Sequence, residues 1–153
     1  MKKILLITIA FILMFPIIVN ADVIEVSRDD SYNVYMDDDS IQRCKQFVLV
    51  KVIIEPVSYH SAFFFQYKKD NKIISVIPSY SVFTMGFTYD KKLYRTFKVE
   101  GYDKNNNIVY TNVTNLEDAP WGNLPYNGSF RYIADYVLKN KFLNFIYKII
   151  GAY

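Results

Sequence analysis

Few residues in this chain have side chains reactive enough for catalysis, and they are scattered. There is one cysteine, Cys44, and one histidine, His60. An activated nucleophile needs a base beside it, and the serines near the histidine, Ser58 and Ser61, are too common a residue type to indicate a triad. A zinc site needs three or four ligands from Cys, His and carboxylates, and haem ligation by His60 or a tyrosine is conceivable only in principle. We identify no catalytic set and no cofactor or metal site, and we expect a protein that is not an enzyme.

Cys44 has no second cysteine with which to form a disulfide inside the chain. Arg43 and Lys45 flank it, and basic neighbours lower the pKa of a thiol and raise its reactivity. Two flanking charges are weak evidence for a reactive thiol, so we favour a structural or incidental role for Cys44.

Two short segments carry enough oxygen ligands to suggest Ca²⁺ binding. The first is Asp37-Asp38-Asp39-Ser40, for which we favour a turn that ends a strand, with Ile41 entering the core. The second, residues 103–107, begins like an EF-hand loop. Its sixth and twelfth positions would be Ile108 and Thr114, where such a loop needs Gly and Glu. We therefore predict a hairpin turn there.

The first 21 residues have the pattern of a secretory signal peptide. Lys2 and Lys3 precede an uncharged, mostly apolar run over 4–19, and Val19-Asn20-Ala21 offers small residues for cleavage. An uncleaved anchor is the alternative, although the run is short of the roughly 20 residues that span a bilayer. Cleavage after residue 21 leaves 16 basic and 15 acidic side chains, so the net charge falls from +3 to +1. We expect one exported domain with no transmembrane span after cleavage and no affinity for nucleic acid.

Strand-forming segments follow one another through most of the remaining chain. The predicted strands are 23–26, 32–36, 47–54, 59–67, 73–77, 81–89, 93–102 and 108–112. Turns are expected at Asp70-Asn71, at Asp90-Lys91-Lys92 and over 103–107. Short turns between alternating strands indicate an antiparallel sheet.

Alternation within 93–102 assigns side chains to the two faces of this sheet. It places Leu93, Phe97 and Val99 on the core face. Tyr94, Tyr102 and Tyr35 then point to the second face, where tyrosines provide apolar area plus a hydroxyl for a partner. The alternative is ordinary cross-strand pairing on a solvated face.

One helix is predicted near the end of the chain. Phe130, Ile133, Ala134, Val137 and Leu138 form a helical stripe, and Ser129 or Asn127 can cap its start. Neither the stripe nor the apolar face of the sheet can be buried alone. We therefore predict an α+β fold, an antiparallel meander of about five to seven strands with the C-terminal helix packed on one face.

The only tryptophan, Trp121, lies in the loop before this helix, among residues that bend the chain. We predict that its ring fills the gap between sheet and helix. The alternative is an exposed ring that contacts a partner.

The last residues, 141–153, form a further apolar segment. Phe142, Phe145, Ile146, Ile149 and Ile150 again fit a helical stripe, which is too short to span a bilayer. Three roles remain open for it: covering the rest of its own sheet, sealing a homodimer, or lying on a membrane surface.

Three segments in order, "VYMDDDSI" (34–41), "YRTFKVEGYDKNNNIVYTN" (94–112) and "APWGNLPYNGSFRYIADYVL" (119–138), give the chain a likeness to a known family. It resembles the surface-adhesin protein E-like family of exported bacterial proteins over about 23–140. The matching residues are Tyr35, Asp37, Ser40, Ile41, Tyr102, Asp103, Lys104, Trp121, Pro125 and Ser129. The resemblance implies a secreted or surface-exposed domain with an antiparallel sheet and a C-terminal helix. The family's namesake is an adhesin for host extracellular-matrix proteins, and none of its binding residues can be placed here.

The expected organisation is a signal peptide (1–21), a surface-adhesin E-like domain (22–140) and an apolar helical extension (141–153). We expect a non-enzymatic binding protein located in the periplasm, on the cell surface or outside the cell. Its partner would be a host matrix protein or an envelope protein. The alternative is an accessory structural protein of the envelope that binds bacterial partners or itself.

Overall fold

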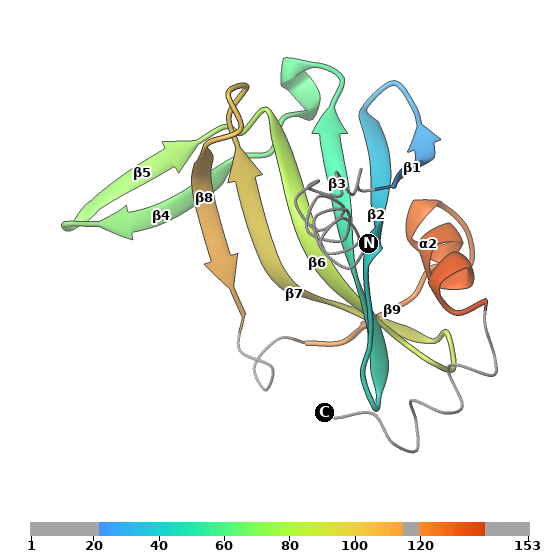
Figure 1. Ribbon diagram of the computed structural model, residues 1–153. Helices are drawn as coiled ribbons and strands as arrows, with labels where there is room; N and C mark the ends of the chain where they lie inside the picture. Colours follow the sequence, from blue (N-terminus) through green and yellow to red (C-terminus); the bar gives the residue numbers. More distant parts are fainter. Residues whose placement is uncertain (1–21, 115–119, 140–153) are drawn as a thin grey trace, which may run out of the picture.

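The computed structural model describes residues 22–114 and 120–139, and shows a seven-stranded antiparallel sheet with one helix on it (Figure 1). The sheet is built from β1 (Val23–Arg28), β2 (Tyr32–Arg43), β3 (Phe47–Pro56), β6 (Tyr80–Thr88), β7 (Leu93–Tyr102) and β8 (Ile108–Val113), which are neighbours in that order. The short β9 (Gly122–Asn123) pairs with the start of β7. The predicted α+β fold is confirmed. The segments predicted as a signal peptide (1–21) and as an apolar extension (141–153, with Phe142, Phe145, Ile146 and Ile149) lie outside the described residues.

A separate hairpin interrupts the meander between β3 and β6. It consists of β4 (Phe65–Lys69) and β5 (Lys72–Val76), and it projects past β8 at the edge of the sheet farthest from β1 (Figure 1). Asp70 and Asn71 both have positive φ, as a two-residue hairpin turn requires, so the predicted turn is confirmed. The predicted strand over 59–67 is wrong in its first half. Residues 59–61 form a 3-10 helix, η1 (Tyr59–Ser61), because the Ala62 amide turns back to the Tyr59 carbonyl.

β2 is longer than predicted, because the acidic segment does not end it. The pairing register of β2 with β3 shifts between Asp37 and Gln42, so residues 38–41 form a bulge inside one strand. The Ser40 hydroxyl donates to the Asp37 carbonyl (2.6 Å) and accepts the Lys51 amide (2.7 Å). These bonds replace the missing ladder bonds, so the strand continues. Ile41 packs against the core, as expected.

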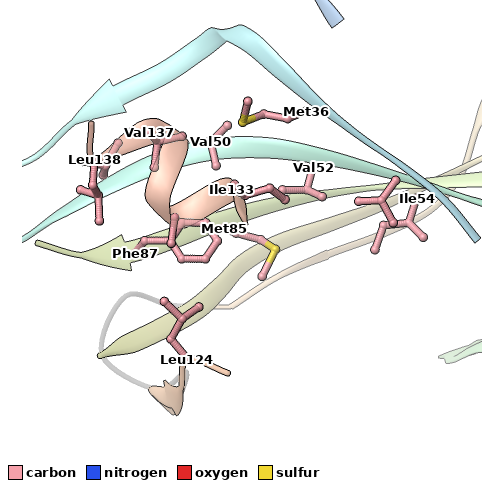
Figure 2. Close-up of a cluster of buried hydrophobic side chains, with 13 residues drawn as sticks. Met36, Val50, Val52, Ile54, Met85, Phe87, Leu124, Ile133, Val137 and Leu138 are labelled. Atoms are coloured by element: carbon pink, nitrogen blue, oxygen red, sulfur yellow. The ribbon is translucent and has the colours of Figure 1, made fainter. Parts of the chain in front are cut away.

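The helix α2 (Ser129–Val137) covers one face of the sheet near β1 and β2 (Figure 1). Figure 2 shows Ile133 between the helix and the buried side chains of β3 and β6. The predicted cap is wrong, because Gly128 occupies the N-cap with φ +89° and no side chain caps the helix. The Ser129 hydroxyl instead shares a hydrogen bond of 2.6 Å with Ser27 of β1. The start of the helix is therefore attached to the edge strand.

A bulge in β7 reverses part of the predicted alternation. Thr84 pairs with Lys98, but Met85 pairs with Thr96, so Phe97 is an extra residue. Tyr94 consequently lies on the helix face, 5.5 Å from the Phe130 ring, and its placement on the second face was wrong. Phe97 lies on the face away from the helix. This face is called the far face below.

Trp121 does not lie between sheet and helix, and that prediction was wrong. Its ring is 5.8 Å from Phe47 and 6.3 Å from Phe97, both on the far face, and the Arg95 guanidinium lies 5.4 Å above it. Leu124, three residues later, is buried in the core on the helix face (Figure 2). Between these two residues, β9 runs beside the start of β7. Trp121 packs on one side of the sheet and Leu124 packs on the other.

Candidate interaction surface

The residues with the most reactive side chains are far apart in the structure. Cys44 precedes β3, and His60 follows it in η1. A ten-residue strand is about 33 Å long, so the two side chains do not form a pair. Burial raises the pKa of the Cys44 thiol, which disfavours the reactive thiolate. Within 22–114 and 120–139 there is also no group of three or more His, Cys, Asp or Glu side chains that can hold a metal ion.

The acidic loop over 103–107 is a hairpin turn, as predicted. The Asp103 carboxylate accepts hydrogen bonds from the Asn105 amide (2.8 Å), the Asn107 amide (2.9 Å) and the Asn107 side chain (3.0 Å). The bond from the Asn107 side chain is the main reason that the pKa of Asp103 is lowered. The carboxylate oxygens therefore stabilise the turn.

The residues that match the surface-adhesin E-like motifs are spread over the domain. Tyr35, Asp37, Ser40 and Ile41 belong to β2, and Tyr102 ends β7 with Asp103 directly after it. Trp121, Pro125 and Ser129 belong to the segment that crosses to α2. The contacts of these residues stabilise strands, turns and the segment that leads to α2. The structure does not bring the set together as one site.

Tyr102 and Tyr35 do lie on the far face. The rings of Tyr102 and Tyr80 are stacked, with centroids 4.9 Å apart and an interplanar angle of 0°. The Tyr80 hydroxyl donates to the Asn106 side chain at 3.1 Å. Burial raises the pKa of Tyr102. Tyr102 and Tyr80 thus pair across neighbouring strands, which is the alternative that the sequence left open for the second face.

Exposed apolar side chains gather instead on the hairpin and on β8. The exposed fractions are 60% for Phe64, 74% for Ile73, 55% for Ile108 and 65% for Val113. Tyr67 and Ile77 are also exposed. Isolated surface apolar residues are ordinary, but several on one projecting element indicate contact with another molecule.

A groove of about 350 Å³ lies where β4 passes over β8. It is lined by Tyr67, Ile108, Val109, Tyr110 and Thr111, and it is called the β4–β8 groove below. Such a volume lies within the usual range for a ligand pocket.

Stacked rings hold the hairpin in place over this groove. Phe65 of β4 lies parallel to Tyr110 of β8, with centroids 4.3 Å apart and planes inclined by 4°. Phe63 continues the row, 6.0 Å from Phe65 and 5.7 Å from Phe83 of β6. The row connects the hairpin to the main sheet. Packed aromatic side chains therefore support both sides of the groove, which are β4 and β8.

β8 is the last strand of the sheet, and it pairs only with β7 among the described strands. Proline and charged side chains commonly block pairing at a sheet edge. The sequence of β8, IVYTNV, contains neither. The Thr114 amide donates to the Phe97 carbonyl. Because backbone groups alternate in direction along an antiparallel strand, those of Thr111 and Val113 point away from β7.

The tip of the hairpin is basic. Lys68, Lys69 and Lys72 are all exposed, and none of them forms an ion pair within the described parts of the chain. The only acidic residue beside them is Asp70, in the turn. The hairpin whose Tyr67 lines the β4–β8 groove therefore carries unpaired positive charge from Lys68 to its tip.

A second hollow, of about 370 Å³, lies between the start of α2, the β1–β2 turn and Phe63. Val34, Ile54 and Phe130 form apolar parts of its lining. At its rim, the Asp29 carboxylate accepts the Ser31 and Tyr32 amides, each at 2.7 Å, and these bonds lower its pKa. This carboxylate is therefore already used in the turn.

Comparisons of the chain with protein-family models, with curated proteins and with solved structures give no match. The resemblance to the surface-adhesin protein E-like family stays a prediction. No helix in the described residues has the length and apolar character needed to cross a membrane.

The β4–β8 groove was not predicted, because a partner surface was expected among tyrosines of the second face and in the apolar stripe over 141–153. Two signals were present. One is the uncharged edge sequence of β8, and the other is the group of lysines on both sides of Asp70-Asn71. What the sequence does not show is that the hairpin folds back over β8. This contact depends on ring stacking between Phe65 and Tyr110, which are 45 residues apart.

Proposed function

We propose that this chain is an exported protein-binding module that works without catalysis, in the manner of an adhesin. The observation that carries the proposal is the concentration of exposed apolar side chains on the projecting hairpin and on β8, beside a groove. Each of these side chains lies on or directly beside a short hairpin or an edge strand, and a large part of its apolar surface stays exposed there.

The composition of this surface fits a protein partner. Interfaces are enriched in tyrosine and phenylalanine at their centre and polar at their rim. Tyr67 and Tyr110 line the groove, Phe64 is exposed directly before β4, and lysines are exposed at the tip of the same hairpin. A host extracellular-matrix protein is the partner class that the family resemblance favours, and an envelope protein of the same cell is the alternative.

The proposal is tested by capture of matrix proteins and of envelope fractions on the immobilised protein. We expect a partner that is retained by wild type and reduced at least about fivefold by Phe64→Ser combined with Ile73→Ser, because both remove exposed apolar area. The matched control is Tyr126→Ser with Val23→Ser, which removes exposed apolar side chains from other parts of the surface.

The control pair should retain the partner. Equal loss in both double variants, or no retained protein in any fraction, would contradict the proposal. A matrix protein as the retained species supports the adhesin reading, whereas an envelope protein supports the accessory one.

A further inference from the structure

The unpaired edge of β8 suggests how the proposed binding occurs. We propose that the β4–β8 groove receives an extended acidic peptide segment of a partner protein, which adds to β8 as a further strand. This inference rests on the proposed function and specifies its binding mode and partner chemistry. It is carried by the backbone of the edge strand, the shape of the groove and the charge of the hairpin tip.

The backbone supplies the first part of the recognition. Thr111 and Val113 direct their amides and carbonyls away from β7, so β8 offers two donors and two acceptors to an incoming strand. Strand addition to a sheet edge gives affinity through such main-chain bonds and takes specificity from pockets for alternate side chains. No strand among the described residues pairs with this edge.

The groove supplies the pocket. An extended segment beside β8 presents every second side chain to the face on which Tyr110 lies. There it meets Tyr67, which overhangs from the hairpin with its ring 6.2 Å from that of Tyr110. An aromatic or branched apolar side chain fits between these walls. The next side chains along the segment point to the opposite face of the sheet and to solvent.

The hairpin tip supplies the preference for acidic residues. Lys68 follows the groove residue Tyr67 directly, Lys69 and Lys72 flank the turn, and all three are exposed and lack ion pairs in the part of the chain that the structure describes. Opposite charge across an interface accelerates association and disfavours wrong partners. An acidic residue of the segment that reaches the hairpin tip is therefore favoured over a basic one.

The same charges favour a different protein over a second copy of this chain. β8 itself contains no carboxylate, and Asp103, the nearest acidic side chain in sequence among the described residues, already accepts bonds from its own turn. Antiparallel pairing of two β8 strands would therefore place no carboxylate of β8 itself beside the lysines. An acidic segment of another protein satisfies both the edge and the tip.

The test uses fluorescence anisotropy with labelled peptides and the purified protein. The first peptide alternates glutamate with valine around a central tyrosine, the second has lysine in place of glutamate, and the third is the first with N-methyl groups on alternate backbone nitrogens. We expect binding of the first peptide and at least about tenfold weaker binding of the other two, since each loses charge complementarity or main-chain bonds.

Three variants of the protein test the same contacts. Thr111→Pro removes an outward amide while sparing the bonds to β7, and should weaken the first peptide about tenfold. Thr111→Val keeps the amide and should bind like wild type. Lys68→Gln, Lys69→Gln and Lys72→Gln together should lower affinity and reduce its dependence on salt.

The outcomes separate this inference from the proposed function. Equal affinity for the methylated and unmethylated peptides overturns strand addition, and this result does not depend on how any variant folds. Equal affinity for the lysine peptide overturns the acidic preference. If a matrix or envelope partner is captured equally by wild type and Thr111→Pro, the module binds protein but not at this edge. Absence of both peptide binding and any captured partner overturns both proposals.

Discussion

Gly86 illustrates how one residue shapes the far face. A Cβ at this position would lie 2.5 Å from Cε2 of Phe97 and 3.4 Å from Cδ2 of Phe47. The Phe97 ring cannot move away freely, because it packs between the Phe47 ring at 5.1 Å and the Trp121 ring at 6.3 Å. Glycine is needed here for space, since its backbone does not require positive φ.

Gly86→Ala should therefore destabilise the protein by about 1–3 kcal/mol, the usual cost of overpacking. The measurement is the midpoint of urea unfolding followed by Trp121 fluorescence. Phe97→Leu removes the ring that meets the new methyl group, so it should cost less in the Gly86→Ala background than in wild type. Additive costs of the two substitutions would show that the methyl group does not meet this ring.

At the scale of elements, the ion pair between α2 and the β6–β7 turn links a helix to the sheet. The Lys91 ammonium lies 2.6 Å from the Asp135 carboxylate, and Arg131 contacts the same carboxylate at 3.3 Å. The hydrogen bond from Lys91 is the main reason that the pKa of Asp135 is lowered. The folded state therefore favours the charged carboxylate.

The pH dependence of stability follows from the direction of this shift. A carboxylate whose pKa is lower in the folded state than in the unfolded state stabilises the fold when it is charged. This stability is fully present above the unfolded-state pKa, near pH 4, and is lost as the pH falls through the lower pKa of the folded state. At pH 7 Asp135→Asn should cost less than about 1 kcal/mol, because the pair is partly exposed. The difference from wild type should shrink toward zero near pH 2. A difference that persists at pH 2 in thermal unfolding curves would contradict this explanation.

The sequence predicted elements well where one periodicity continued without interruption. The strand over 47–54 and the helical stripe from Phe130 to Leu138 have a single pattern, and both were found. The predicted end of β2 and the predicted faces of β7 were wrong because each strand contains a bulge, where it holds extra residues opposite its neighbour. A bulge depends on pairing with another strand, so the sequence of one strand alone cannot reveal it.

The candidate site was less predictable for the same reason. The lysines and the Asp70-Asn71 turn were visible in the sequence. The hairpin's position over β8 depends on the Phe65–Tyr110 stack and could not be predicted. The Trp121 ring was expected between sheet and helix, but it packs against Phe47 on the far face, just before β9 pairs with β7.

At the scale of the whole molecule, the two faces of the sheet carry separate side-chain clusters. Ile133, Val50 and Phe87 belong to the core under α2 (Figure 2), and Trp121 reports on the far face. Both clusters share the strands β3 and β7. Small single domains usually unfold in one cooperative transition. We therefore expect the two faces to unfold together.

Ile133→Ala tests this cooperation. Ile133 is fully buried, so its truncation should cost about 2–5 kcal/mol. The loss should lower the midpoint measured by Trp121 fluorescence as much as the midpoint measured by far-ultraviolet circular dichroism, although the tryptophan is on the other face. Two separate midpoints would show that the faces unfold independently.

The central claim about the whole molecule is that its partner adds a strand to β8. Amide hydrogen exchange at Thr111 and Val113 tests this most directly, because their amides point outward and have no strand partner in the described structure. Adding the acidic alternating peptide at saturation should slow exchange at both amides by at least about tenfold, while the amides of β1, at the opposite edge, stay unchanged. Unchanged exchange at Thr111 and Val113 with the peptide bound would contradict strand addition.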